Sequence, residues 1–152
     1  MRNFDENLIN AKYHLAIAQR LFENYANYEE KRFLVGVINE SALAVGALVR
    51  GYLILEGKGG RNSKKNLQIF ISEIAPKYFD EIIVDNLRKV LEIEKAQRLS
   101  PIEFSKKDKI ILLVEGEYRF LKAERFKEFL NSAELAIRRF SEVSDKYKKV
   151  FD

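Results

Sequence analysis

Side chains that could carry out chemistry are few and widely spaced along the chain. His14 is the only histidine, and there is no cysteine. Without cysteine, a thiol nucleophile, a disulfide and a zinc-thiolate site are all excluded. Di-metal helical bundles need paired Glu-x-x-His motifs, which a single histidine cannot supply. A metal site made of carboxylates alone is the alternative that stays open, because acids are plentiful. We favour no metal site, no cofactor and no catalytic residue, and a non-enzyme over an enzyme.

Two ionisable residues lie in apolar surroundings. His14 is placed beside an apolar stripe, where a histidine is more often a packed side chain than a catalytic base. Glu40 lies inside the most apolar stretch, 33–55, where a charge must be paired or change its pKa. We expect an ion pair with a neighbouring Lys or Arg, or a helix edge facing solvent. The alternative is a polar contact in a dimer or ligand cleft.

The other acidic pairs do not have the spacing of an acid–base dyad. Glu92 and Glu94 are two positions apart, so on a helix they point in different directions. Glu115 and Glu117 flank a predicted turn.

One segment is distinctly basic. The net charge of the chain is +4, and residues 58–65 alone contribute four cations and no acid. The segment is glycine-rich and leads into a predicted helix start, where backbone N–H groups and the helix dipole can hold a phosphate. A flexible connector is the other interpretation. The candidate anion- or nucleotide-binding residues are Lys58, Arg61, Lys64, Lys65 and Asn66. Lysines at 106, 107 and 109 and at 146, 148 and 149 would extend this site into an RNA footprint if all lay on one side.

Helical periodicity defines the elements that must position these residues. Apolar residues three and four apart predict helices over 5–28, 29–56, 64–75, 77–98 and 123–148, with Pro76 breaking the third helix from the fourth and Ser100-Pro101 ending the fourth. Gly36, Gly46 and Gly51 weaken the second helix, and we expect them to allow close approach of another helix.

Residues 33–55 are long and apolar enough to cross a bilayer. Glu40 and Arg50 inside this run would be costly in lipid, so we predict a buried central helix and no membrane partner. The absence of cysteine and of an apolar signal region predicts a cytoplasmic protein. The abundance of Lys, Glu and Ile is typical of a thermophile.

The hydrophobic period changes from helical to alternating before the last helix. Residues 109–114 and 117–121 are two β-rich runs on either side of Glu115-Gly116, which predicts a hairpin. In that register Ile111, Leu113, Tyr118 and Phe120 share one face, and Glu117 and Arg119 share the other. The alternative is that this stretch begins the last helix. The predicted fold is mostly α, a single domain over 1–152: an up-and-down bundle of four to five helices with a small β-hairpin before the last helix.

Three segments together resemble the HEPN superfamily, in particular its archaeal members. They are 11–18 in the first helix, the small and apolar run 42–49 followed by 53–57 in the second, and the short helix 66–71. The resemblance covers about residues 5 to 98 and implies a helical bundle that often dimerises. Many members are RNases, and many are toxins paired with minimal nucleotidyltransferases.

The chain departs from the family's catalytic signature, an Arg followed four to six residues later by His. His14 has no Arg at that distance before it, and Arg61 is followed five residues later by Asn66. An asparagine cannot act as a general acid or base. We therefore predict a non-catalytic helical interaction or binding module, and we expect a homodimer formed through the apolar helices. The alternative is a nucleotide- or RNA-binding protein, including a degenerate HEPN-type RNase, and a nucleotidyltransferase-type protein is a further candidate partner.

Overall fold

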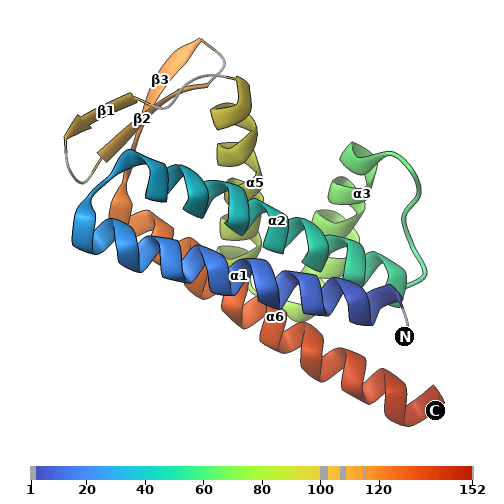
Figure 1. Cartoon of the computed structure of the whole chain (residues 1–152). Helices are drawn as coiled ribbons and strands as arrows, with labels where there is room; N and C mark the ends of the chain where they lie inside the picture. Colours follow the sequence, from blue (N-terminus) through green and yellow to red (C-terminus); the bar gives the residue numbers. More distant parts are fainter. Residues whose placement is uncertain (1–2, 100–102, 107–108, 115, 152) are drawn as a thin grey trace.

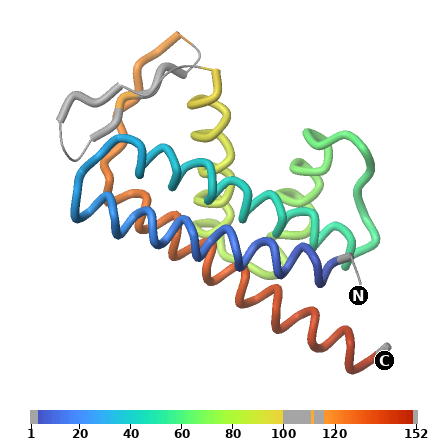
Figure 2. Tube along the Cα trace, in the orientation of Figure 1, coloured from blue at the N-terminus to red at the C-terminus, as the bar shows by residue number. Residues whose placement is uncertain are grey.

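Four long helices make up the body of the molecule. The computed structural model describes residues 3–99, 103–106, 109–114 and 116–151. Helices α1 and α2 lie side by side in opposite directions, α6 lies behind them, and α5 crosses α2 steeply (Figures 1 and 2). The four helices are α1 (Asn3–Tyr28), α2 (Lys31–Leu55), α5 (Glu81–Leu99) and α6 (Ala123–Phe151). The predicted mostly α bundle is confirmed.

The break between α1 and α2 is sharp because the backbone reverses at one residue. Glu29 adopts a positive φ of 51°, a left-handed conformation that ends a helix. As a result α2 begins at Lys31, two residues later than the sequence pattern predicts.

Pro76 does not break the short helical region where the sequence predicts it should. α3 (Ser63–Ile69) continues through a π-helical turn, η1 (Phe70–Ile74), into α4 (Ala75–Tyr78). Proline lacks an N–H and its ring collides with the preceding α-helical turn. After the π turn the Ala75 N–H bonds the Phe70 carbonyl, and Pro76 lies in the first turn of α4, where a missing N–H is tolerated, so the chain stays helical past Pro76. The actual break comes at Phe79, which is extended, and the Asp80 carboxylate then accepts a hydrogen bond from the Ile83 N–H at the start of α5.

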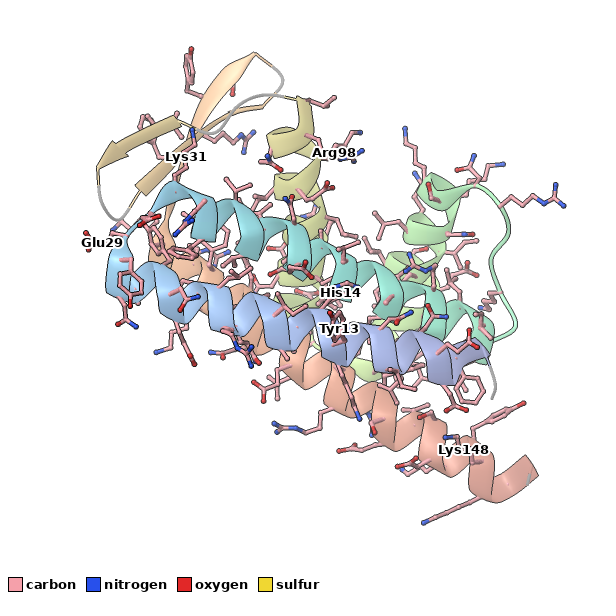
Figure 3. All side chains as sticks on the ribbon, viewed as in Figure 1. Tyr13, His14, Glu29, Lys31, Arg98 and Lys148 are labelled. Carbon is pink, nitrogen blue, oxygen red and sulfur yellow. The ribbon has the colours of Figure 1, made fainter. Side chains whose placement is uncertain are left out.

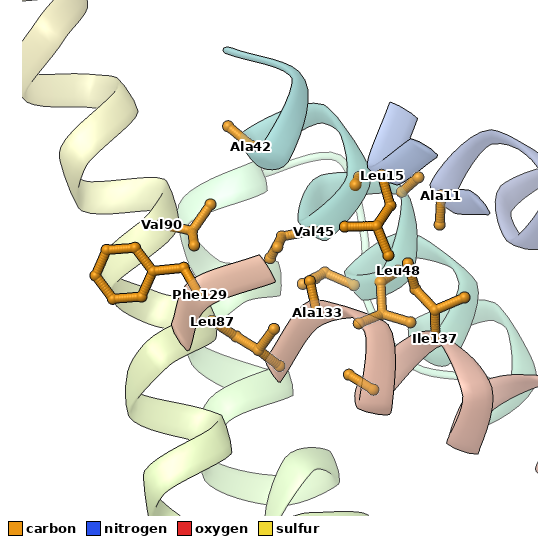
Figure 4. Close-up of a cluster of buried hydrophobic side chains, with 14 of the residues drawn as sticks. Ala11, Leu15, Ala42, Val45, Leu48, Leu87, Val90, Phe129, Ala133 and Ile137 are labelled. Atoms are coloured by element: carbon orange, nitrogen blue, oxygen red, sulfur yellow. The ribbon is translucent and has the colours of Figure 1, made fainter. Parts of the chain in front are cut away.

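The hydrophobic core lies where α1, α2, α5 and α6 meet (Figure 4). Helix α2 is buried on most of its circumference, as its sequence predicts. Helix α6 supplies the opposite wall with the predicted stripe, in which six of seven side chains are buried and Val143 is half-buried. The buried members of that stripe are Phe126, Phe129, Leu130, Ala133, Ile137 and Phe140.

Two of the three glycines in α2 are close-contact positions. A Cβ on Gly36 would lie 2.8 Å from Leu21 Cδ1 of α1, and one on Gly51 would lie 2.8 Å from Phe140 Cζ of α6. The prediction of close helix approach is confirmed at these positions. It is wrong for Gly46, where the nearest atom is 3.4 Å away and belongs to Arg50 of the same helix.

A small antiparallel sheet precedes α6, and it contains the predicted hairpin. Strand β2 (Lys109–Val114) pairs with β3 (Glu117–Lys122), with Ile111 opposite Phe120 and Leu113 opposite Tyr118. This register is the one predicted, and Gly116 turns the chain with φ 81°. A further strand not foreseen from the sequence, β1 (Glu103–Lys106), pairs with the other side of β2.

Helix α2 is the one described helix that is long and apolar enough to span a membrane. More than half of its most apolar window is buried inside the fold, at 56%. That burial is what the core helix of a helical bundle requires, so the length and composition of α2 are accounted for by packing.

Candidate functional site

His14 and Glu40 face each other across the seam between α1 and α2. The His14 Nδ1 lies 2.6 Å from the Glu40 Oε2, and both side chains are about one quarter exposed. Since a carboxylate only accepts hydrogen bonds, Nδ1 donates here. Glu40 is paired, as the sequence indicates, but with a histidine rather than with a Lys or Arg.

Sequence reasoning considered His14 and Glu40 separately and missed that they meet. A signal was present. In an antiparallel helix pair, positions equally far from the connection lie opposite each other, as Leu21 and Gly36 do. By that rule His14 falls opposite a position about one turn beyond Glu40, within reach of a glutamate side chain.

Exposed hydrophobic side chains surround the His14–Glu40 pair. Tyr13 is 62% exposed and its ring contacts the His14 ring edge to face, with centroids 5.2 Å apart (Figure 3). Ile9 is one helical turn from Tyr13, and Leu43 is one turn from Glu40, so all lie along the same outward side. We call this surface the α1–α2 face, defined by Ile9, Tyr13, His14, Glu40, Leu43 and Ile54.

The basic segment 58–65 includes most of the connection from α2 to α3 and the first residues of α3, which begins at Ser63. Arg61, Lys64 and Lys65 are exposed, and Lys58 Nζ lies 3.6 Å from the Glu73 carboxylate. The Asn62 side chain caps α3 by accepting from the Lys65 N–H. The segment therefore contains three solvent-facing cations and one that is close to an acid.

Asn66 closes this connection on itself. Its side-chain oxygen accepts from the Gly60 N–H at 2.8 Å, and its side-chain nitrogen donates to the Gly60 carbonyl at 2.7 Å. Gly59, at φ 94°, gives the loop the shape that these bonds need. Each end of the Asn66 amide makes one bond to the loop, so a ligand would have only the second N–H and the second lone pair of the amide to use.

The structure does not bring the basic segments together. The 58–65 segment and strand β2, which carries Lys109, lie at opposite ends of the molecule (Figure 1). Near the C-terminus Lys148 is paired with Asp5 of α1 at 2.7 Å. Lys107 lies outside the described residues. A single basic footprint over all three segments is therefore not formed.

A buried aromatic cluster joins the C-terminal part of α2 to α4 and α6. The Tyr52 ring contacts Phe70, Tyr78, Phe79 and Phe140, with centroids 4.7 to 5.8 Å apart. Burial, with a smaller effect of neighbouring Tyr78, raises the pKa of the Tyr52 hydroxyl well above its ordinary value. Burial and the hydrogen bond that it donates to Glu56 raise the pKa of Tyr78 to about 12.

The remaining acidic pairs do not form a site. Glu92 is exposed and bonds Arg88, whereas Glu94 pairs with Arg98 on another side of α5. Glu117 is exposed on β3, and Glu115 lies outside the described residues. Within 3–99, 103–106, 109–114 and 116–151, no three His, Asp or Glu residues gather as metal ligands do.

The chain was compared with protein-family models, curated proteins and solved structures, and none of them matches. The geometry of the chain's own side chains is therefore the basis for assigning a function.

Proposed function

We propose that this protein is a non-catalytic helical module that acts by binding other macromolecules, and that it binds a second copy of itself through the α1–α2 face. The observation that carries the proposal is the combination of exposed hydrophobic side chains with a paired His14 and Glu40 at the centre of one face. Interfaces are depleted of unpaired charge at their centre and enriched in aromatic and apolar residues.

The second copy is favoured as occupant because the face needs no complementary charge from a partner. His14 and Glu40 already pair within one chain, so covering them would leave neither unpaired. Around them, Tyr13 and Leu43 offer apolar area that a twofold-related copy would match with the same residues.

Replacing Leu43 with arginine tests this proposal. Leu43 is 49% exposed, so the substitution should not disturb the core, but it would place a charge at the centre of the contact. Sedimentation equilibrium should give an average mass above the 17.8 kDa of one chain for the wild type and a lower mass for Leu43→Arg.

Leu135→Arg is the matched control. Leu135 is 48% exposed and lies on α6 rather than on the α1–α2 face, so this variant should keep the wild-type mass. A wild type that is monomeric at every concentration would refute the proposal, as would equal masses for the two variants.

The resemblance to HEPN proteins remains part of this proposal. It is supported by the order of one long amphipathic helix, one buried helix rich in small residues and a short third helix. It predicts that a nucleotidyltransferase-type protein is among the partners. Affinity purification of the native protein, with identification of the proteins retained, tests that prediction.

A further inference from the structure

Strand β3 has the features of a strand that pairs with another chain. It is the last strand of the three-stranded sheet, so no described strand covers its outer edge. Glu117, Tyr118, Arg119 and Phe120 are all exposed, which means that this part of the strand faces solvent on both sides. Tyr118 is 64% exposed and Phe120 is 67% exposed. Both are aromatic residues, which favour β-strands and pack well against neighbouring strands.

The two edges of the sheet differ in regularity. The pairing of β1 with β2 is interrupted by a register shift between Phe104 and Lys106, and such bulges discourage pairing at an edge. The pairing of β3 with β2 is continuous over six residues. The regular edge of the sheet, without a bulge, is therefore β3.

The exposed part of β3 carries one acid and one base, and Lys122 adds a second cation at the end of the strand. Charged residues, especially lysine, often protect an edge strand against pairing. Glu117 and Arg119 have opposite signs and lie two positions apart, on the same face of the strand. When two copies of this strand run antiparallel, the acid of each copy can face the base of the other.

We propose that β3 pairs with β3 of a second copy, antiparallel and centred on Tyr118, to form a six-stranded sheet. In this register Glu117 lies opposite Arg119 of the second copy and Arg119 lies opposite Glu117, giving two cross-strand charge pairs. Tyr118 lies opposite Tyr118. The residues of β3 that pair in this register are 117 to 119, since Gly116 lies in the turn at φ 81°.

Neighbouring registers lack this complementarity. In an antiparallel pair related by a twofold axis normal to the sheet, opposing residues lie on the same face of the sheet. The pair must therefore be centred on a residue of β3, and the neighbouring registers are those centred on the next residues along the strand. Centring on Arg119 would set two arginines opposite each other. Centring on Phe120 sets Arg119 opposite Leu121 and leaves Glu117 without a basic partner. The contact is separate from the α1–α2 face and does not rest on it.

Cysteine cross-linking tests the register directly, because the chain has no other cysteine. Opposing Cα atoms in an antiparallel pair are about 4.5 to 5.5 Å apart, which is within disulfide range. Under mild oxidation Tyr118→Cys should form a covalent dimer, while Arg119→Cys and Phe120→Cys should form little. Preferred cross-linking at 119 or 120, or none at any of the three, would overturn the proposal.

Charge reversal tests the complementarity, and it is made in the Leu43→Arg background so that the α1–α2 face does not contribute. Glu117→Arg and Arg119→Glu should each weaken self-association about tenfold, because like charges then oppose each other. An equimolar mixture of the two variants should associate as the parent does, which also shows that both are folded. If the mixture associates no better than either variant alone, the pairing is refuted.

Discussion

At the scale of single residues, glycines in α2 show where a neighbouring helix packs closely against it and where none does. Gly51 faces the ring of Phe140 at a distance that leaves no room for a methyl group, whereas Gly46 has open space and one flexible arginine side chain nearby. The same substitution should therefore have opposite effects at these two positions of one helix.

Gly51→Ala is expected to destabilise the protein by about 1–2 kcal/mol, because the rigid Phe140 ring and its neighbours must shift. Gly46→Ala is expected to stabilise it by about 0.5–1 kcal/mol, because alanine has the better helix propensity. Urea unfolding followed by circular dichroism gives both values. Destabilisation of similar size by both substitutions would contradict this account.

The tyrosines of the aromatic cluster predict how stability depends on pH. The pKa of Tyr78 in the folded protein, about 12, is above its unfolded value near 10. A raised pKa contributes stability that is fully present below pH 10 and is lost as the pH rises through 12. The melting temperature should therefore fall between pH 10 and pH 12, with buried Tyr52 acting in the same direction.

Tyr78→Phe isolates that contribution. The variant should be somewhat less stable than the wild type at pH 7, since the hydrogen bond to Glu56 is lost. Its melting temperature should then fall less steeply between pH 10 and pH 12. Parallel melting curves for the two proteins over this range would show that Tyr78 does not titrate as described.

At the scale of elements, the loop from α2 to α3 is held by one side chain. Asn66→Ala removes both hydrogen bonds to Gly60 and should destabilise the protein by about 1–2 kcal/mol. Asn66→Asp keeps the acceptor for the Gly60 N–H but sets a carboxylate oxygen against the Gly60 carbonyl oxygen, so it should destabilise the protein as well.

Limited trypsin digestion provides a local measure of this loop. Cleavage after Lys58 and Arg61 should be faster in both Asn66 variants than in the wild type. Gln68→Ala, an exposed substitution on the same helix, serves as the control. Equal cleavage rates in all four proteins would mean that Asn66 does not hold the loop.

The long helices and the hairpin could be predicted from sequence because each has a local sequence pattern. The stripe of α6 follows from burial of one side of that helix, and the β2–β3 register follows from two β-rich runs on either side of a two-residue link. The π turn before Pro76 could not, since it depends on how a local clash is relieved. Strand β1 could not either, because its four residues include one apolar side chain, Phe104, and show no alternation.

The candidate site could be predicted only in part, for a related reason. The position of Glu40 inside an apolar stretch could be seen in the sequence. Its partner, however, belongs to another helix, and the sequence pattern does not determine which side chains meet between two helices. The sequence also indicated Asn66 as a candidate binding residue, because it is polar and follows a basic loop. That its amide bonds Gly60 depends on the path of the loop backbone.

At the scale of the whole molecule, the two proposed contacts lie on different elements, so they need not compete. The α1–α2 face belongs to the first two helices, and β3 belongs to the sheet near one end of the bundle (Figure 1). A chain that uses both contacts forms assemblies larger than a dimer. Leu43→Arg should leave the β3-linked dimer, and its combination with Arg119→Glu should weaken that dimer about tenfold and raise the fraction of monomer.

The junction between β3 and α6 has a consequence for such assemblies. β3 ends at Lys122 and α6 begins at Ala123, so no flexible connector separates the strand from a helix of 29 residues. That helix is about 43 Å long at 1.5 Å per residue. Two strands joined in one register would hold two such helices at a fixed angle and spacing. The C-terminal ends of the two α6 helices would then lie at a defined separation. Two groups attached to these ends would be held at a distance fixed by the β3 pairing.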